Sequence, residues 1–98
     1  MLRDRAPSRQ TRAVLAELLA DPAANRYGYE LAKATGLASG TLYPILMRLE
    51  ERGLLEARWE FQDSRPRHVY RLTPAGIAFA QSSAAEQAVP VSARKAMA

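Results

Sequence analysis

Apolar residues recur at helical spacing in the first half of the chain, and this pattern predicts three short helices. The first helix is expected from about Ser8, whose hydroxyl suits an N-cap, to Ala20. Its apolar face consists of Val14, Leu15, Leu18 and Leu19. A shorter helix is expected from about Gly28 to Thr35, and Gly36 is well suited to end it. Because only a tight turn follows, the second and third helices are predicted to form a helix-turn-helix.

The third helix has the most regular apolar stripe, together with an internal proline. Residues at i, i+3, i+4 and i+7 form the stripe: Leu42, Ile45, Leu46 and Leu49. Ser39 is the candidate N-cap, and Gly53 ends the helix. Pro44 then falls at about the fourth or fifth helical position, where it removes at most the first regular hydrogen bond. A helical wheel puts Pro44 beside Gly40 on the exposed face, opposite the stripe.

After Gly53 the period changes to two, which predicts a β-hairpin. Four residues of the first strand alternate with charged residues and are expected to form a buried face: Leu55, Ala57, Trp59 and Phe61. Trp59 is therefore predicted to lie in the core. Residues 62–66 are rich in turn formers, and the second strand is expected from Arg67 to Leu72.

A fourth helix is expected to begin at Thr73-Pro74, with threonine as the N-cap, and to run to about Ala88 before Pro90 stops it. The order helix, helix, helix, hairpin, helix predicts a mainly α protein with a winged helix-turn-helix fold. We expect a flexible basic arm over residues 1–7 and the winged domain over 8–73. The helix over 74–89 is a candidate dimerisation element, and 90–98 is expected to be a disordered tail.

Charge and composition narrow the function. The chain has 98 residues, a net charge of +4 and a pI of about 10.0, which favours a polyanionic partner. It has no cysteine, which excludes disulfides, thiolate zinc sites and cysteine nucleophiles. No apolar run reaches the roughly 18 residues of a membrane span, and no signal peptide is evident, so a cytoplasmic location without a membrane partner is expected.

No residue pattern indicates catalysis. His68 is the only histidine and has no partners at metal-ligand spacing. No serine stands in a histidine–carboxylate arrangement, and there is no glycine-rich phosphate loop. We therefore expect neither an enzyme nor a cofactor.

The exposed side of the third helix and the hairpin tip are the candidate DNA-binding surfaces. The helix N-terminus favours anions, whereas the acidic pair Glu50-Glu51 lies at the other end. The candidate contacts on the helix are Ser39, Gly40, Thr41, Tyr43, Pro44 and Arg48. In the hairpin they are Arg65, Arg67 and His68. A solvated helix face and a polar hairpin turn are the alternative explanations of these residues.

Two elements of the sequence resemble the PadR family of bacterial transcriptional regulators. They are "GTLYPIL…LEERGLL", residues 40–55, and "YRLTPAG", residues 70–76, in the family's order and separation. The resemblance implies a winged-helix DNA-binding domain, usually a repressor that acts as a homodimer on inverted-repeat operators. It also implies that residues 39–41, Tyr43 and Pro44 meet DNA from the recognition helix, and Arg65 and Arg67 from the wing.

The C-terminal end departs from the family. The small members have a long, leucine-rich last helix for dimerisation, whereas the last helix here is short and rich in alanine. No ligand site is carried over, because the only tryptophan is in the predicted wing, and a small-molecule effector stays unknown. A protein-interaction module that packs the same third helix on a partner through Met47 and Pro44 is the alternative function.

Overall fold

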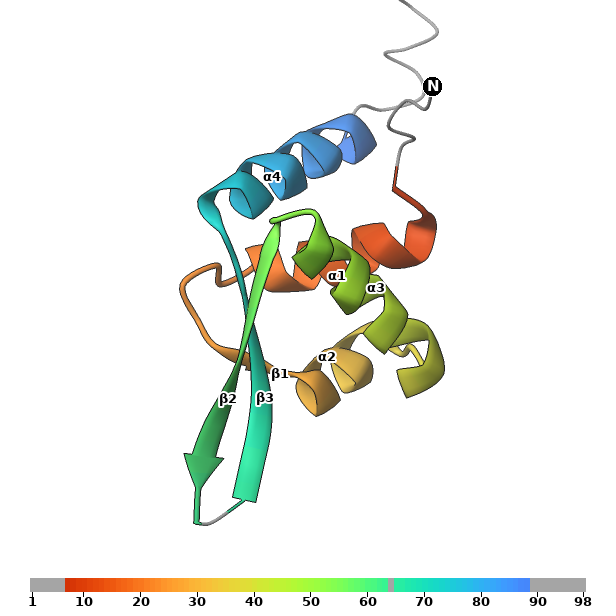
Figure 1. Ribbon diagram of the computed structural model, residues 1–98. Coiled ribbons are helices and arrows are strands. Elements are labelled where there is room, and N and C mark those ends of the chain that lie inside the picture. Colours follow the sequence, from red (N-terminus) through yellow and green to blue (C-terminus); the bar gives the residue numbers. More distant parts are fainter. Residues whose placement is uncertain (1–6, 64, 89–98) are drawn as a thin grey trace, which may run out of the picture.

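A computed structural model describes residues 7–63 and 65–88 of the chain. The elements, in order, are α1 (Arg9–Leu19), β1 (Arg26–Tyr27), α2 (Gly28–Thr35), α3 (Ser39–Glu51), β2 (Leu55–Gln62), β3 (Arg65–Leu72) and α4 (Pro74–Ala88). The β2–β3 hairpin projects away from the helices, and α4 lies at the opposite end of the described structure (Figure 1). This is the predicted winged helix-turn-helix fold, with one strand more than the sequence pattern indicated.

The first two helices have the predicted bounds to within one residue. Ser8 is the N-cap of α1, because its hydroxyl accepts a hydrogen bond of 3.1 Å from the amide of Thr11. Gly36 ends α2 with φ of 75°, a left-handed conformation that favours glycine. Both helix ends could be predicted from the sequence, because each depends on the residue type at one position.

The start of α3 differs from the prediction. Ala38, not Ser39, is the N-cap, and its carbonyl accepts from the amides of Thr41 and Leu42 at 2.9 Å. Ser39 is the first helical residue, so Pro44 is the sixth rather than the fourth or fifth. Its missing amide would have bonded to the carbonyl of Gly40 four residues earlier, so the proline removes a regular helical bond within the second turn.

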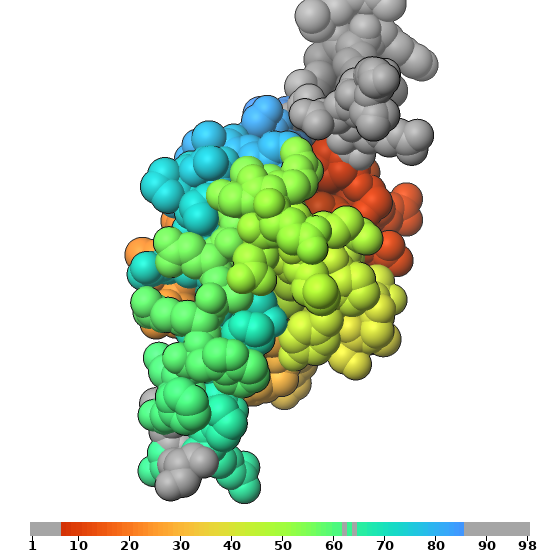
Figure 2. Space-filling model, in the orientation of Figure 1, coloured from red at the N-terminus to blue at the C-terminus, as the bar shows by residue number. Residues whose placement is uncertain are grey.

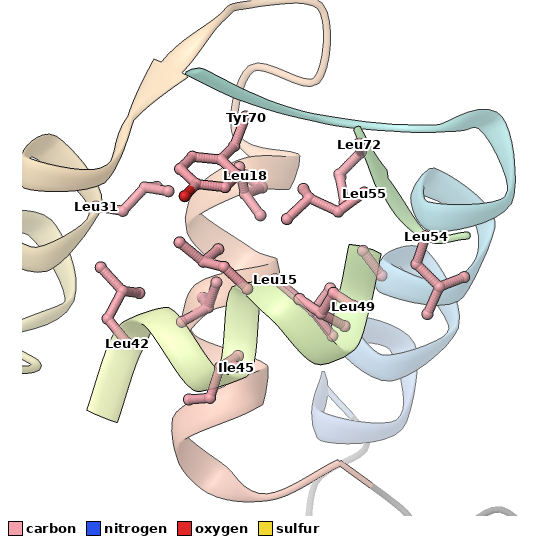
Figure 3. Packing of buried hydrophobic residues seen from close by; sticks show 13 residues of the cluster. Leu15, Leu18, Leu31, Leu42, Ile45, Leu49, Leu54, Leu55, Tyr70 and Leu72 are labelled. Atoms are coloured by element: carbon pink, nitrogen blue, oxygen red, sulfur yellow. The ribbon is translucent and has the colours of Figure 1, made fainter. Parts of the chain in front are cut away.

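The core lies between α1, α3 and the base of the hairpin, with α4 covering one end (Figure 3). The predicted stripe of α3 is buried: Leu42, Ile45, Leu46 and Leu49 are at most 4% exposed. From α1 the core receives Val14, Leu15 and Leu18, and from the sheet Leu55, Tyr70 and Leu72. Two amphipathic helices therefore bury their apolar faces against each other and against one face of the sheet.

The sheet has three antiparallel strands in the order β1-β3-β2. β2 and β3 pair from Leu55↔Leu72 to Gln62↔Arg65, so β3 begins two residues before its predicted start. Pro66 is tolerated inside β3 because β1 pairs only with Val69 and Tyr70, which leaves β3 with an open edge further out. The two-residue strand β1 was not predicted, since two residues show no periodicity.

Trp59 does not lie in the core, contrary to the prediction. Its side chain is 60% exposed and that of Phe61 is 73% exposed, whereas Leu55 on the same face is 2% exposed. The alternation of apolar and charged residues continues along β2, but the helices cover only the base of the hairpin (Figure 1). Periodicity reports which face a residue occupies, and it does not report whether another layer covers that face.

The hairpin and α4 meet the end of α3 at a close corner. Thr73 caps α4 as predicted: its hydroxyl accepts from the Gly76 amide at 3.0 Å and donates to the Gly53 carbonyl at 2.7 Å. The Thr73 amide also donates to the carbonyl of Leu54 at 3.1 Å. A Cβ at Gly76 would overlap this Leu54 oxygen, so only glycine allows α4 to approach so closely.

Several predictions fall outside the described residues. These are the arm up to residue 6, the stop at Pro90 and the tail over 90–98. Within the described part of α4, Ala80 and Ser83 are buried. None of the helices in the described ranges is both long enough and apolar enough to cross a membrane.

Because α4 packs closely against the backbone at Leu54, one methyl group added at Gly76 should have a large effect on stability. Gly76→Ala should lower the free energy of unfolding by about 3 kcal/mol, because the new Cβ must displace backbone rather than a flexible side chain. Gly40→Ala is the matched control: nothing lies within 4 Å of its Cβ position, so stability should stay equal or rise by up to about 1 kcal/mol. Urea denaturation measures the free energy of unfolding of both variants, and equal values would contradict the close packing of α4 on the Leu54 carbonyl.

Candidate nucleic-acid interface

The exposed side of α3 has little side-chain bulk and no charged residue in its first two turns. Gly40 and Pro44 are both exposed and lie one turn apart, and nothing lies within 4 Å of the Cβ position of Gly40. Arg48 and Met47 follow on the same side, and Met47 is 59% exposed. A partner can therefore come close to the backbone in the first half of α3, and the positively charged Arg48 lies one turn further along.

The N-terminus of α2 lies against α3 through a glycine and a tyrosine. A Cβ at Gly28, the first residue of α2, would overlap the ring and hydroxyl of Tyr43. The absent side chain therefore makes the room in which the Tyr43 ring rests. Tyr43 remains 39% exposed, so its position is set by α2 while part of the ring faces solvent.

A hollow of about 340 Å³ lies between α2, α3 and the wing. Its lining residues are Tyr27, Gly28, Tyr29, Tyr43, Pro66, Arg67 and His68. These residues supply tyrosine hydroxyls, a guanidinium and an imidazole, and no carboxylate is among them. Such a set of hydrogen-bond donors with one permanent positive charge is suited to a phosphate group.

Tyr27 ties the wing to the start of α2. Its hydroxyl donates to the Glu60 carboxylate at 2.6 Å, and this hydrogen bond is the main reason that the pKa of Tyr27 is raised. The guanidinium of Arg67 lies 5.5 Å from the centre of the Tyr27 ring, as in a cation–π contact. The Tyr29 ring stacks on Tyr27 with centroids 5.8 Å apart. The wing is therefore fixed relative to the helix-turn-helix.

The basic residues of the hairpin are not equally available. Arg71 pairs with Glu56 at 3.5 Å, and Arg58 donates to the side-chain oxygen of Asn25 at 3.4 Å. Arg65 is exposed at the outer end of β3, and Arg67 is half-buried beside the hollow. The two arginines that the sequence singled out are thus the two that face outward or into the hollow.

His68 belongs to an aromatic stack that begins in the core. Its ring stacks on Trp59 with centroids 4.4 Å apart and planes 8° apart. On the inner side, its Nδ1 lies 3.2 Å from the hydroxyl of Tyr70. Burial, followed by the nearby Tyr43 and Glu50, raises the pKa of Tyr70 to about 12, so this hydroxyl stays protonated at neutral pH. Tyr70 therefore anchors the stack to the folded body.

The structure brings three of the candidate residues together, and the others lie on the same two elements, α3 and the wing. Figure 2 shows α3 and the outer part of β2 on the same face, with residues of β3 between them. Tyr43, Arg67 and His68 line the same hollow. The remaining candidates, Ser39, Gly40, Thr41, Pro44 and Arg48, are on α3, and Arg65 is at the end of the wing.

Sequence reasoning missed Tyr27, Gly28 and Tyr29 as part of this surface. The sequence pattern predicts Gly28 and Tyr29 only as the start of a helix, and Tyr27 lies in no predicted element. A glycine between two tyrosines at a helix start was the available signal, but only the fold shows that Tyr43 rests on that glycine. Among the described residues, no group of three potential ligands is arranged to hold a metal ion.

Comparison with known proteins gives the family. Residues 15–82, more than half of the chain, match the PadR-like family of transcriptional regulators. The transcriptional regulator Rv3488 of Mycobacterium tuberculosis is 48% identical to this chain over 54 residues, which are 55% of this chain and 45% of that protein. The match therefore spans less than half of the relative's length.

Solved structures agree with the fold. A PadR family transcriptional regulator from Eggerthella lenta is similar with a TM-score of 0.65 and 31% identity, over 80% of this chain and 74% of that one. The MepR–DNA complex from S. aureus is similar with a TM-score of 0.68 and 25% identity, over 82% of this chain and 66% of that one. Winged helix-turn-helix architecture, the two sequence elements and the match over residues 15–82 together show that this chain belongs to the PadR-like family of transcriptional regulators.

Proposed function

We propose that this protein is a cytoplasmic, sequence-specific DNA-binding repressor that reads its operator with α3 in the major groove and its basic wing on the DNA backbone or in the minor groove. The observation that carries the proposal is the hollow that joins α3 to the wing, because Tyr43 of α3 and Arg67 and His68 of β3 line it together. MepR, which shares the fold, has been solved in complex with DNA, and this supports DNA as the partner.

Within this proposal the residues have different roles. Gly40 and Pro44 let the α3 backbone approach base edges, where the Pro44 ring meets a thymine methyl, while Thr41 and Arg48 donate to bases or phosphates. The hollow receives a backbone phosphate between the two grooves, held by Tyr43, Arg67 and His68.

The proposal includes a homodimer on an inverted-repeat operator. In α4, Ala80 and Ser83 face the body, and Ala78, Ser82 and Ala85 are exposed. Two such small-residue faces can pack closely across a two-fold axis. A dimer would read two half-sites, and their sequence would then be palindromic.

Selection of bound duplexes from a random DNA pool, followed by mobility shift of the selected sequence, tests the function. We expect a palindromic consensus that binds at least about a thousandfold more tightly than random DNA at physiological salt. Equal binding of selected and random duplexes would exclude sequence-specific regulation and favour the protein-interaction alternative, for which exposed Met47 is the supporting observation.

Arg65→Ala should weaken binding to all duplexes by a similar factor. Loss of one phosphate contact should reduce the magnitude of the slope of log affinity against log salt by about 1, while the consensus stays unchanged. Arg71→Ala is the matched control, because Arg71 is engaged with Glu56 at the base of the hairpin. If the two variants had equal slopes, Arg65 would not contact phosphate.

Gly28→Ala should separate binding from stability. The new Cβ displaces only the end of the Tyr43 side chain, so the free energy of unfolding should change by less than about 1 kcal/mol. Affinity for the selected duplex should fall about tenfold, because the Tyr43 hydroxyl leaves the hollow. In a Tyr43→Ala background the same glycine change should have no further effect. A full additional loss in that background would show that Gly28 acts independently of Tyr43.

A further inference from the structure

The wing has two chemically different faces. On one face β2 and β3 carry charged residues, including Arg58, Glu60 and Arg67. On the other face the register places Trp59 opposite His68 and Phe61 opposite Pro66. This second face continues the core face of the hairpin, on which Leu55, Tyr70 and Leu72 are buried.

The outer part of this apolar face is uncovered in the monomer. Phe61 is 73% and Trp59 60% exposed, while Tyr70, the next residue inward from His68 on the same face of β3, is 4% exposed. Large exposed aromatic residues grouped on one face of a small domain mark an interaction surface. We call Trp59, Phe61 and Pro66 the aromatic ridge.

Within the ridge, Trp59 is held in a defined position. Trp59 rests on the His68 ring at 4.4 Å, and His68 in turn contacts Tyr70, which is anchored in the core. One face of the indole is therefore occupied and the other is available. A side chain fixed in this way loses little conformational entropy when it binds.

Charge identifies the class of partner. By the same register Arg65 and Arg67 lie on the other face of the hairpin. Exposed Arg65 neighbours Pro66 in the sequence, and Arg67 lines the same hollow as Pro66. The outer part of β2, the strand that carries Trp59 and Phe61, is visible on the same side of the molecule as α3 (Figure 2). A narrow wing with aromatic and proline side chains on one face and arginines on the other fits the DNA minor groove, whose walls are sugar and whose edges are phosphate.

We propose that the aromatic ridge is an apolar minor-groove contact, in which Phe61 and Pro66 enter the groove and Trp59 packs on deoxyribose. This inference rests on the proposed DNA-binding function and assigns residues to it that basic-patch reasoning leaves out. Phe61 and Pro66 act as one wedge because they are direct cross-strand neighbours. The wedge widens or bends the groove, and Arg65 and Arg67, on the opposite face of the wing, hold phosphates at the groove edge.

Phe61→Ala tests the wedge on the selected duplex. We expect affinity to fall about tenfold or more while the salt slope stays that of the unchanged protein, since no counterion-releasing contact is lost. Phe61→Leu should retain most of the affinity. End-to-end energy transfer on a doubly labelled duplex should show a bend with the unchanged protein and a smaller one with Phe61→Ala.

Trp59 supplies an independent readout because it is the only tryptophan. Its emission should change in intensity and shift to shorter wavelength when the selected duplex is added, as its exposed face leaves water. If the emission stayed unchanged and Phe61→Ala bound the duplex as tightly as the unchanged protein, the minor-groove contact of the aromatic ridge would be overturned, while the proposed function would stay intact. If the unchanged protein bound no duplex specifically, both proposals would fall.

Discussion

The close corner between the end of α3 and the start of α4 is the constraint on which the arrangement of the binding surface depends. Thr73 bonds to the backbone of Gly53 and Leu54, and the missing side chain of Gly76 lets α4 press on the Leu54 carbonyl. Because β2 begins one residue after Leu54 and β3 ends one residue before Thr73, this corner also fixes the base of the wing. The direction of the wing relative to α3 is therefore set by backbone contacts, which vary less than side-chain contacts.

A second glycine fixes the other end of the same surface. Tyr43 rests where Gly28 has no side chain, and Tyr27 reaches across to Glu60 of the wing. The start of α2, the middle of α3 and the outer part of β3 are thus joined around one hollow lined by hydrogen-bond donors. On a small domain with a modest core, two glycine-mediated contacts hold three elements in register without deep burial of charged groups. The Tyr27 hydroxyl is engaged with Glu60, whereas Tyr43 is 39% exposed beside the hollow.

The sequence predicted what depends on local rules and missed what depends on the third dimension. The stripe of α3, the caps at Ser8, Gly36 and Thr73 and the hairpin itself follow from periodicity and single-residue preferences. The predicted N-cap of α3, Ser39, is wrong. Ala38 is the N-cap and uses only its backbone carbonyl, although the serine side chain is the better capping group. The prediction that Trp59 lies in the core is wrong, because alternation identifies the face of a strand and not whether another layer covers it. β1 and the role of Gly28 could not be predicted, because both depend on contacts between distant segments.

The central claim is that one continuous surface, formed by the start of α2, the exposed side of α3 and the outer halves of β2 and β3, binds duplex DNA. Backbone amide shifts in nuclear magnetic resonance spectra, recorded while the selected duplex is added to the protein, test it most directly. The account predicts that the largest shifts fall on residues 27–29 and 39–48 and on the outer wing, while the exposed side of α4 changes little. Largest shifts along α4 or α1, with α3 and the wing unaffected, would contradict it.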